Sequence, residues 1–276
     1  MANVPLIRLN NGVAIPQLGF GVGRVPPEET QRTVEAALEA GYRHIDTAAA
    51  YRNEAGVGAA VRASGLPRQE VFITTKLRNG EQRTARRAFE NSLRELGLDY
   101  VDLYLIHWPV PAQNLYVHAW HELEQIVDEG LARAVGVANF LPEHLATLLA
   151  AADTVPAENQ IELHPSLQQH AVAEWSREHG IAVEAYSPLG RGADLAAAAV
   201  TALAARHGAT PAQIVLAWEL AQGYMAIPKT VSRERMAENL AAVDIRLSAE
   251  EIEAVTGLEA GNRLGSDPAT LNVSQL

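Results

Sequence analysis

The sequence repeats one pattern eight times: a short apolar run rich in β-branched residues, then a longer segment with the apolar spacing of a helix. This alternation is typical of parallel strands buried beneath crossover helices. Eight such units in 276 residues predict an α/β protein, a single (β/α)8 or TIM barrel, because that fold takes about 250 residues. The runs begin near Leu18, Arg43, Val71, Val101, Ala132, Ala157, Ala182 and Met225.

The segments outside the eight units are short. Residues 7–15 surround the dipeptide Asn11-Gly12, which predicts a β-hairpin with a type I′ turn that covers the bottom of the barrel. After Asn262 the periodicity ends, and we expect an irregular tail over the barrel. No linker, charge block or clear repeat marks a boundary, so we expect residues 1–276 to form one domain.

The composition excludes several classes of protein. A chain without cysteine has no disulfide, no thiolate metal site and no cysteine nucleophile. A formal net charge of −11 would repel a phosphate backbone, and nucleic acid is not an expected partner. No segment approaches the ~18 consecutive apolar residues of a membrane span, and no signal peptide is recognisable, so we expect a cytoplasmic protein. An anionic ligand would need a local cluster of positive charge.

Polar residues follow several of the predicted strands, where active sites of such barrels lie. Asp46 follows the second strand with Tyr51 in the loop beyond, Lys76 ends the third strand, and His107 ends the fourth. A tyrosine hydroxyl becomes a usable acid if a cation such as Lys76 stabilises the phenolate. Asp46 would hold Lys76, and His107 would orient a substrate carbonyl. The group lacks a carbon nucleophile, so a hydride carrier must bind nearby.

At this point the sequence resembles a known family. The stretches DTAAAYRNEAGVG, TTKL, LDYVDLYLIHWP, GVANF, NQIELHP, YSPLG and IPKTVSRERMAEN look like the successive motifs of the aldo-keto reductases, most of all the bacterial branch that contains 2,5-diketo-D-gluconate reductases. The resemblance implies a reductase of small carbonyl compounds. Because the family is mostly monomeric, it also implies a monomer. It also implies that Tyr51 is the general acid and that Asp46, Lys76 and His107 complete a catalytic tetrad.

The same resemblance implies a cofactor site. The carboxamide would bind Asn139 and Gln160, the nicotinamide ring would stack on Tyr186, and the pyrophosphate would follow Ser187 to Leu189. Lys229, Thr230 and Arg235 would bind the adenosine 2′-phosphate, which favours NADPH over NADH because two cations and a hydroxyl form the required local anion site. The complete set of expected cofactor contacts is Gly21, Val22, Asp46, Asn139, Gln160, Tyr186, Ser187, Leu189, Lys229, Thr230, Val231, Arg235, Glu238 and Asn239.

Three positions depart from the family pattern. Ala138 stands where a serine is usual, so one carboxamide hydrogen bond is expected to be absent. Gly23 and Arg78 stand where bulky aromatic residues are common. These two departures predict a wider substrate pocket, although Arg78 could instead turn outward and pair with a surface acid. The expected substrate contacts are Gly23, Tyr51, Arg78, His107 and Trp108.

Other features of the sequence allow different interpretations. The glycines at 19, 21 and 23 suggest a dinucleotide-binding fold, but Arg24 occupies the place of the third fingerprint glycine. His118 and His121 could share a metal ion, yet no third ligand has suitable spacing, and we expect no metal. Taken singly, Asp46 could be a strand cap, Lys76 a surface lysine and His107 a core histidine. A cofactor-binding regulatory subunit without turnover is the alternative function.

Overall fold

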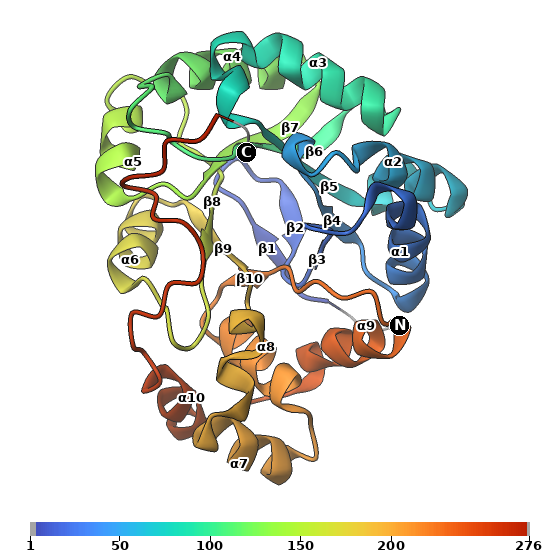
Figure 1. Cartoon of the computed structure of the whole chain (residues 1–276), viewed down its shortest axis with the longest axis vertical. Helices are drawn as coiled ribbons and strands as arrows, with labels where there is room; N and C mark the ends of the chain where they lie inside the picture. The colour runs from blue at the N-terminus through green and yellow to red at the C-terminus, as the bar shows by residue number, and fades with distance from the viewer. Residues whose placement is uncertain (1–3, 275–276) are drawn as a thin grey trace.

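The structure, a computed structural model, describes residues 4–274, and these form a closed barrel of eight parallel strands inside a ring of helices (Figure 1). Leu18 pairs in parallel with Ala226 and thereby closes the ring between the first and last strands. The predicted (β/α)8 barrel is confirmed, and every strand begins within two residues of its predicted start. The barrel strands are β3 (Phe20–Gly21), β4 (His44–Asp46), β5 (Phe72–Leu77), β6 (Val101–Ile106), β7 (Ala132–Ala138), β8 (Glu158–Glu162), β9 (Ala182–Tyr186) and β10 (Met225–Ala226).

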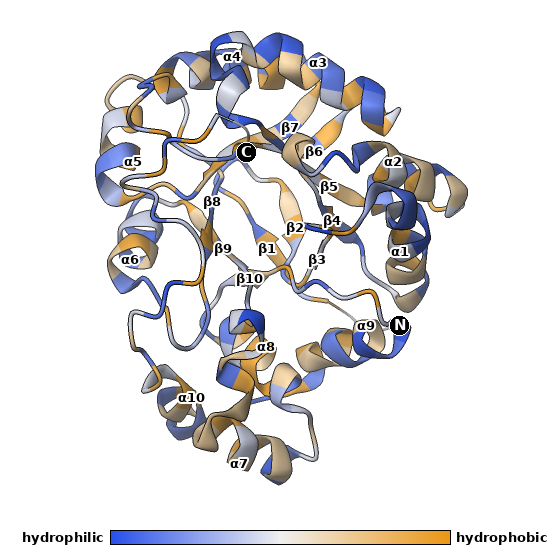
Figure 2. Ribbon diagram, viewed as in Figure 1, coloured by the Kyte–Doolittle hydropathy of each residue, from blue (hydrophilic) through white to orange (hydrophobic). Residues whose placement is uncertain are grey.

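The helices pack their apolar faces on the barrel and expose their polar faces (Figure 2). Among the described residues, no helix is long and apolar enough to cross a membrane. The α-helices are α1 (Pro27–Ala40), α2 (Glu54–Ala63), α3 (Ala85–Leu96), α4 (Tyr116–Asp128), α5 (Pro142–Leu149), α6 (His170–Glu178), α7 (Ala198–His207), α8 (Pro211–Ala221), α9 (Arg233–Leu240) and α10 (Ala249–Thr256). Short 3-10 helices are η1 (Ala49–Tyr51), η2 (Arg68–Glu70), η3 (Asn79–Thr84), η4 (Gly190–Gly192), η5 (Asp194–Ala196) and η6 (Ala241–Asp244).

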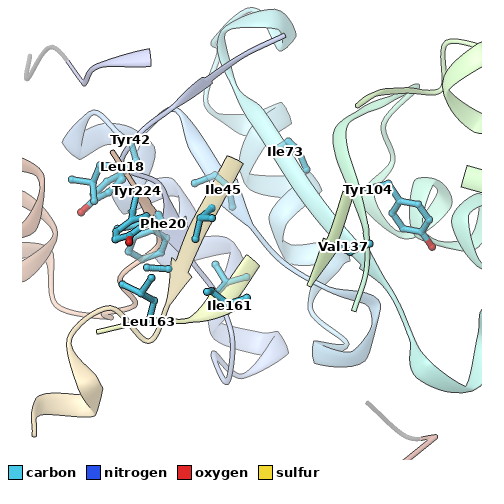
Figure 3. Close-up of a cluster of buried hydrophobic side chains, with 14 of the residues drawn as sticks. Leu18, Phe20, Tyr42, Ile45, Ile73, Tyr104, Val137, Ile161, Leu163 and Tyr224 are labelled. Atoms are coloured by element: carbon cyan, nitrogen blue, oxygen red, sulfur yellow. The ribbon is translucent and has the colours of Figure 1, made fainter. Parts of the chain in front are cut away.

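Two hydrophobic layers follow from the alternation of side chains along each strand. Outward-facing residues such as Phe20, Ile45 and Tyr104 pack between the strands and the helices (Figure 3). Inward-facing residues such as Phe72 and Leu103 belong to a separate cluster inside the barrel. The interior also holds buried polar side chains, which include Asp46, Lys76 and Gln160.

The N-terminal hairpin of β1 (Leu6–Arg8) and β2 (Ala14–Pro16) covers the bottom, as predicted. Its Asn11 side chain donates to the carbonyl of Arg133, near the start of β7, at 3.0 Å. The predicted type I′ turn is wrong, because Gly12 has a positive φ of 87° but Asn11 does not. Leu9 N–H bonds to Val13 O and Gly12 N–H to Leu9 O, the pattern of a three-residue loop ending in a left-handed glycine.

The tail after Asn262 crosses the opposite, C-terminal end of the strands without regular structure (Figure 1). Leu264 N–H and Gly265 N–H donate to the two carboxylate oxygens of Glu162, the last residue of β8. Farther along, the Asn79 side chain donates to the carbonyl of Val273 at 2.9 Å. The expected irregular tail therefore lies at the mouth of the barrel.

Candidate active site

Backbone strain marks one face of the barrel. All the non-glycine residues that have positive φ in the described chain lie in loops that follow a barrel strand, whereas the loops that lead into strands use glycine for this purpose, as at Gly41, Gly97 and Gly180. Left-handed backbone is unfavourable for residues with a Cβ and persists mainly at functional sites. The mouth at the C-terminal ends of the strands is thus the candidate active site. The strained residues are Arg24, Arg52, Val110, Asn114, Asn139, Gln169, Ser187 and Arg191.

The structure brings the four predicted tetrad side chains together at this mouth. Parallel pairing of β4 with β5 sets Asp46 beside Thr74, one inward-facing position below Lys76. The Lys76 ammonium donates to both Asp46 carboxylate oxygens at 2.6 Å and to Thr47 O at 2.9 Å. It also lies 5.5 Å from the centre of the Tyr51 ring, and the Tyr51 and His107 rings meet edge to face at 5.8 Å.

Burial dominates the electrostatics of the tetrad. Burial alone would lower the pKa of Lys76, but the facing Asp46 and Tyr51 reverse this and raise it, so the ammonium stays charged. Burial, assisted by Lys76, lowers the pKa of His107 to about 3, and its imidazole is neutral at physiological pH. A neutral imidazole can still donate one N–H to a carbonyl oxygen.

The pKa of Tyr51 is raised, whereas the sequence led us to expect that Lys76 would lower it. Lys76 does act to lower it, as expected, but burial outweighs that effect and the pKa is raised above its ordinary value of 10.0. The negative charge of Asp46 adds to the increase and offsets part of the ammonium charge. The site therefore holds the hydroxyl in its protonated form, the form that a proton donor must have.

The polar residues expected to bind a cofactor carboxamide surround the tetrad. Asn139, with a φ of 63°, donates from its side chain to His107 O at 3.0 Å and accepts from the Tyr186 hydroxyl at 2.9 Å. Gln160 donates to Asp46 at 2.9 Å. Ala138 is buried and, unlike the usual serine, offers no hydroxyl. Other expected cofactor contacts lie at the same rim: Gly21 ends β3 and Val22 follows it, and Ser187 and Leu189 follow β9.

The predicted anion cluster lies between β10 and the start of α9. Thr230 accepts from the N–H of Ser232, and the Ser232 hydroxyl caps α9 by accepting from the N–H of Arg235. Lys229 and Arg235 are exposed and form no ion pair with any described residue. Two cations beside a helix N-terminus fit a phosphate group.

The remaining members of this cluster are placed differently from one another. Val231 is exposed, whereas Asn239 is buried. Glu238 is half-buried and accepts from the Thr210 hydroxyl at 2.6 Å, a contact that holds α9 to the start of α8. Glu238 therefore has a clear structural role in addition to the cofactor contact that the family resemblance implies.

The expected substrate residues lie around Tyr51. A Cβ atom added at Gly23 would meet the Tyr51 ring and hydroxyl oxygen at 3.6 to 3.7 Å, so a bulky residue at this position would cover the hydroxyl. Trp108 is buried, and its carbonyl accepts from the Gln82 side chain. Arg78 directly follows β5 and is half-buried.

Other residues singled out in the sequence have structural explanations. Gly19 and Gly21 face into the barrel, where a Cβ at Gly19 would come within 2.4 Å of the His44 ring and one at Gly21 within 3.0 Å of the Ile227 carbonyl. The glycine series thus makes room inside the barrel. His121 contacts Glu124 at 3.1 Å, and no group of metal-binding side chains occurs among the residues described.

Sequence reasoning missed a set of buried acids. Glu158, Glu162 and Glu184 are fully buried, and all three face the inside of the barrel from β8 and β9. The available signal was polar side chains at every second position of β8, which is Glu158, Gln160 and Glu162, in a strand that is otherwise read as buried. Glu162 lies next to His164, which contacts Asp194 at 2.9 Å on its other side.

Comparison with known proteins agrees with this geometry. The model of the aldo/keto reductase family matches residues 15–260. An aldo-keto reductase of Mycolicibacterium smegmatis is 50% identical over 97% of this chain and 98% of its own. The methylglyoxal reductase DkgA of Yersinia pestis is 48% identical over the same shares. The crystal structure of a Gox0644 mutant in complex with NADPH has a TM-score of 0.93 at 41% identity, covering 97% of this chain and 98% of that one. The resemblance predicted from the motifs is confirmed: this chain belongs to the aldo/keto reductase family.

Proposed function

We propose that this protein reduces aldehydes and ketones to alcohols with NADPH, and that Tyr51 donates the proton. The observation that carries the proposal is the buried Lys76–Asp46 pair placed under Tyr51 and beside a neutral His107. A hydride carrier is required because no side chain of the tetrad can deliver hydrogen to carbon. Membership of the aldo/keto reductase family supports the same reaction.

The chemistry assigned to the chain is a proton transfer. The His107 imidazole donates to the carbonyl oxygen and orients it, and the Tyr51 hydroxyl gives its proton to that oxygen. Lys76 stabilises the phenolate that remains, and Asp46 holds Lys76 in place. When bound, NADPH supplies the hydride. The raised pKa of Tyr51 keeps the proton on the hydroxyl until the carbonyl oxygen gains negative charge.

The residues present fit NADPH. Tyr186 is half-buried at the rim, and its hydroxyl bonds to Asn139, so a face of its ring can stack on a nicotinamide while Asn139 and Gln160 hold the carboxamide. Lys229 and Arg235 are exposed, without ion pairs among the described residues, and they bind the 2′-phosphate together with Thr230. The similar Gox0644 mutant was crystallised in complex with NADPH, which supports the assignment.

The substrates we propose are small polar dicarbonyls and keto acids. Gly23 leaves the Tyr51 hydroxyl uncovered, and Arg78 adds a positive charge near the mouth. Relatives named methylglyoxal reductases support a small dicarbonyl. The enzyme acts as one domain over residues 1–276 and as a cytoplasmic monomer, with no nucleic acid or membrane partner; the net charge of −11 and the absence of cysteine agree with this.

One assay tests the function. NADPH oxidation is followed at 340 nm with methylglyoxal, a keto acid and a panel of neutral aldehydes, in parallel with NADPH binding by fluorescence quenching. We expect turnover that saturates with a dicarbonyl. Tight NADPH binding without turnover on any carbonyl would instead favour the regulatory subunit and overturn the proposed reaction.

A further inference from the structure

A second polar group lies inside the barrel directly beneath the tetrad. It consists of His44 from β4, Glu158 from β8 and Glu184 from β9, and all three side chains are fully buried. Strand register places Glu184 beside Gln160, the residue that also contacts Asp46. Nothing in the proton transfer described above requires these acids, and burying carboxyl groups is unfavourable unless they are paired. Their arrangement therefore calls for a role.

Gln160 connects the two groups. Its side-chain nitrogen donates to Asp46 Oδ2 at 2.9 Å and to Glu184 Oε2 at 2.6 Å. An amide nitrogen has only two protons, so both are engaged. The Gln160 amide group cannot turn over without losing both bonds, and its carbonyl oxygen is the end that remains for a ligand. That oxygen can only accept a hydrogen bond, so the ligand group that it contacts must be a donor, such as the N–H of a carboxamide.

Glu158 completes the arrangement. Both Glu158 carboxyl oxygens and Glu184 Oε1 are buried without any hydrogen-bond donor if both groups are treated as carboxylates. Glu158 pairs with Ala182 and Gln160 with Glu184, so the two acids are diagonal neighbours inside the barrel. Burial and then the Glu184 carboxylate raise the pKa of Glu158 well above its ordinary value, and two buried anions so close together do not both ionise. A proton on Glu158 that is donated to Glu184 supplies the missing donor. Glu184 then keeps its other oxygen as an acceptor for Gln160.

The pKa shifts of Glu184 and its neighbours agree with a proton held by the Glu158–Glu184 pair. Burial and then Asp46 raise the pKa of Glu184 to about 8, although Lys76 and the Gln160 hydrogen bond oppose this. His44 faces Glu184 at 3.7 Å from β4 and is neutral, because burial lowers its pKa to about 3. The pair therefore binds at least one proton at neutral pH, which reduces the negative charge that it places near Lys76.

We propose that Glu184, supported by the proton it shares with Glu158, is a positioning residue that orients Gln160 and so fixes both Asp46 and the nicotinamide carboxamide. The role of the carboxamide rests on the proposed function; the orientation of Gln160 rests on the contacts alone. Loss of the acceptor at position 184 frees the Gln160 amide to turn over and present its nitrogen to the ligand.

Two substitutions separate the acceptor from the charge. Glu184→Gln removes the charge but keeps an acceptor, because its side-chain carbonyl can still accept from Gln160. Glu184→Leu removes the acceptor at similar volume, and Glu184→Met repeats the test if the leucine variant does not fold. Glu219→Gln is the matched control, since Glu219 is another fully buried acid with unpartnered oxygens, on α8 and outside this network.

The decisive readout is discrimination between NADP⁺ and its 3-acetylpyridine analogue, which has no carboxamide N–H, by dissociation constants from fluorescence quenching. We expect wild type, Glu184→Gln and Glu219→Gln to bind NADP⁺ about tenfold more tightly than the analogue, as expected for one hydrogen bond. Glu184→Leu should lose this preference and bind NADP⁺ about tenfold more weakly. A folded Glu184→Leu that keeps the wild-type preference would overturn the proposal.

The outcome is independent of turnover. If the wild type binds NADP⁺ with the expected preference yet reduces no carbonyl, the reaction proposed above fails and the role of Glu184 stands. If the wild type reduces carbonyls but does not distinguish the two nucleotides, the reaction stands and the role of Glu184 fails.

Discussion

The Lys76 ammonium lies 2.6 Å from both carboxylate oxygens of Asp46, and both side chains are almost completely removed from water. A buried ion pair is weak evidence for stability, because the desolvation of two charges can exceed their attraction. The position of the Lys76–Asp46 pair beneath Tyr51 explains why the pair is present. The pair keeps a charged ammonium under the Tyr51 ring. Because this site is shielded from water, the ammonium stabilises a phenolate far more than a hydrated cation would.

Replacement of Tyr51 by phenylalanine should abolish most of the reduction while preserving the fold. The variant keeps the ring and its edge-to-face contact with His107 but has no proton to give, so kcat should fall by about 10²- to 10⁴-fold. NADPH affinity should change little. Steady-state kinetics with methylglyoxal, with NADPH titrations as the control, measure both. Retention of more than about a tenth of the wild-type rate would remove Tyr51 from the role of general acid.

Cofactor preference should depend on Arg235. Charge-assisted hydrogen bonds from exposed cations to the 2′-phosphate contribute roughly 1.5 to 3 kcal/mol each, so the wild type should prefer NADPH over NADH by about tenfold or more. Arg235→Ala should lose most of this preference and leave NADH binding unchanged. Dissociation constants for both nucleotides decide the matter, with Arg233→Ala as control because Arg233 pairs with Glu39 at 2.6 Å instead. Equal affinities in the wild type would contradict the assignment.

Arg78 should select acidic substrates if its side chain faces the pocket. A guanidinium in partly desolvated contact with a carboxylate is worth on the order of 1 kcal/mol or more. Arg78→Ala should then lower kcat/KM for a keto acid and spare a neutral aldehyde. A surface Arg78 paired with an acid predicts no difference between the two substrates, and that result would exclude it from recognition. Arg83→Ala is a suitable control, since Arg83 is exposed on η3.

His164 should make stability depend on pH in the alkaline range. Burial alone would lower its pKa, but Asp194 and Glu162 raise it from 6.5 to about 9. Because the folded state binds the proton more tightly, the stabilisation is full below pH 6.5 and is lost as the pH rises through 9. The gap in unfolding free energy between wild type and His164→Gln should narrow by roughly 3 kcal/mol between pH 6 and pH 10.

Urea unfolding followed by circular dichroism at pH 6, 8 and 10 measures this gap. His207→Gln is the matched control, because His207 contacts Glu251 at 3.0 Å near the surface between α7 and α10, where solvent screens the pair. A gap that stays constant with pH would mean that folding does not raise the pKa of His164.

Local patterns in the sequence were sufficient for the barrel and for the position of the tetrad. The apolar runs place each strand to within two residues. Because parallel strands all end at the same mouth, a polar residue at the end of a strand, such as Lys76 or His107, is assigned to the site without knowledge of its partners. The type of the hairpin turn did not follow from the dipeptide, since Gly12 alone of the two residues has positive φ.

Only the tertiary structure decided how these residues act on one another. The contact between Gln160 and Asp46 joins residues 114 positions apart, and the shared proton of Glu158 and Glu184 depends on two strands meeting in register. The direction of the Tyr51 pKa shift follows from how fully the surrounding chain excludes water, since burial outweighs the facing lysine. Periodicity records which face of a strand is buried, but desolvation and charge pairing depend on every element that closes around the group. For that reason the sequence could place Tyr51 at the site, whereas the direction of its pKa shift and the contacts around it came from the folded barrel.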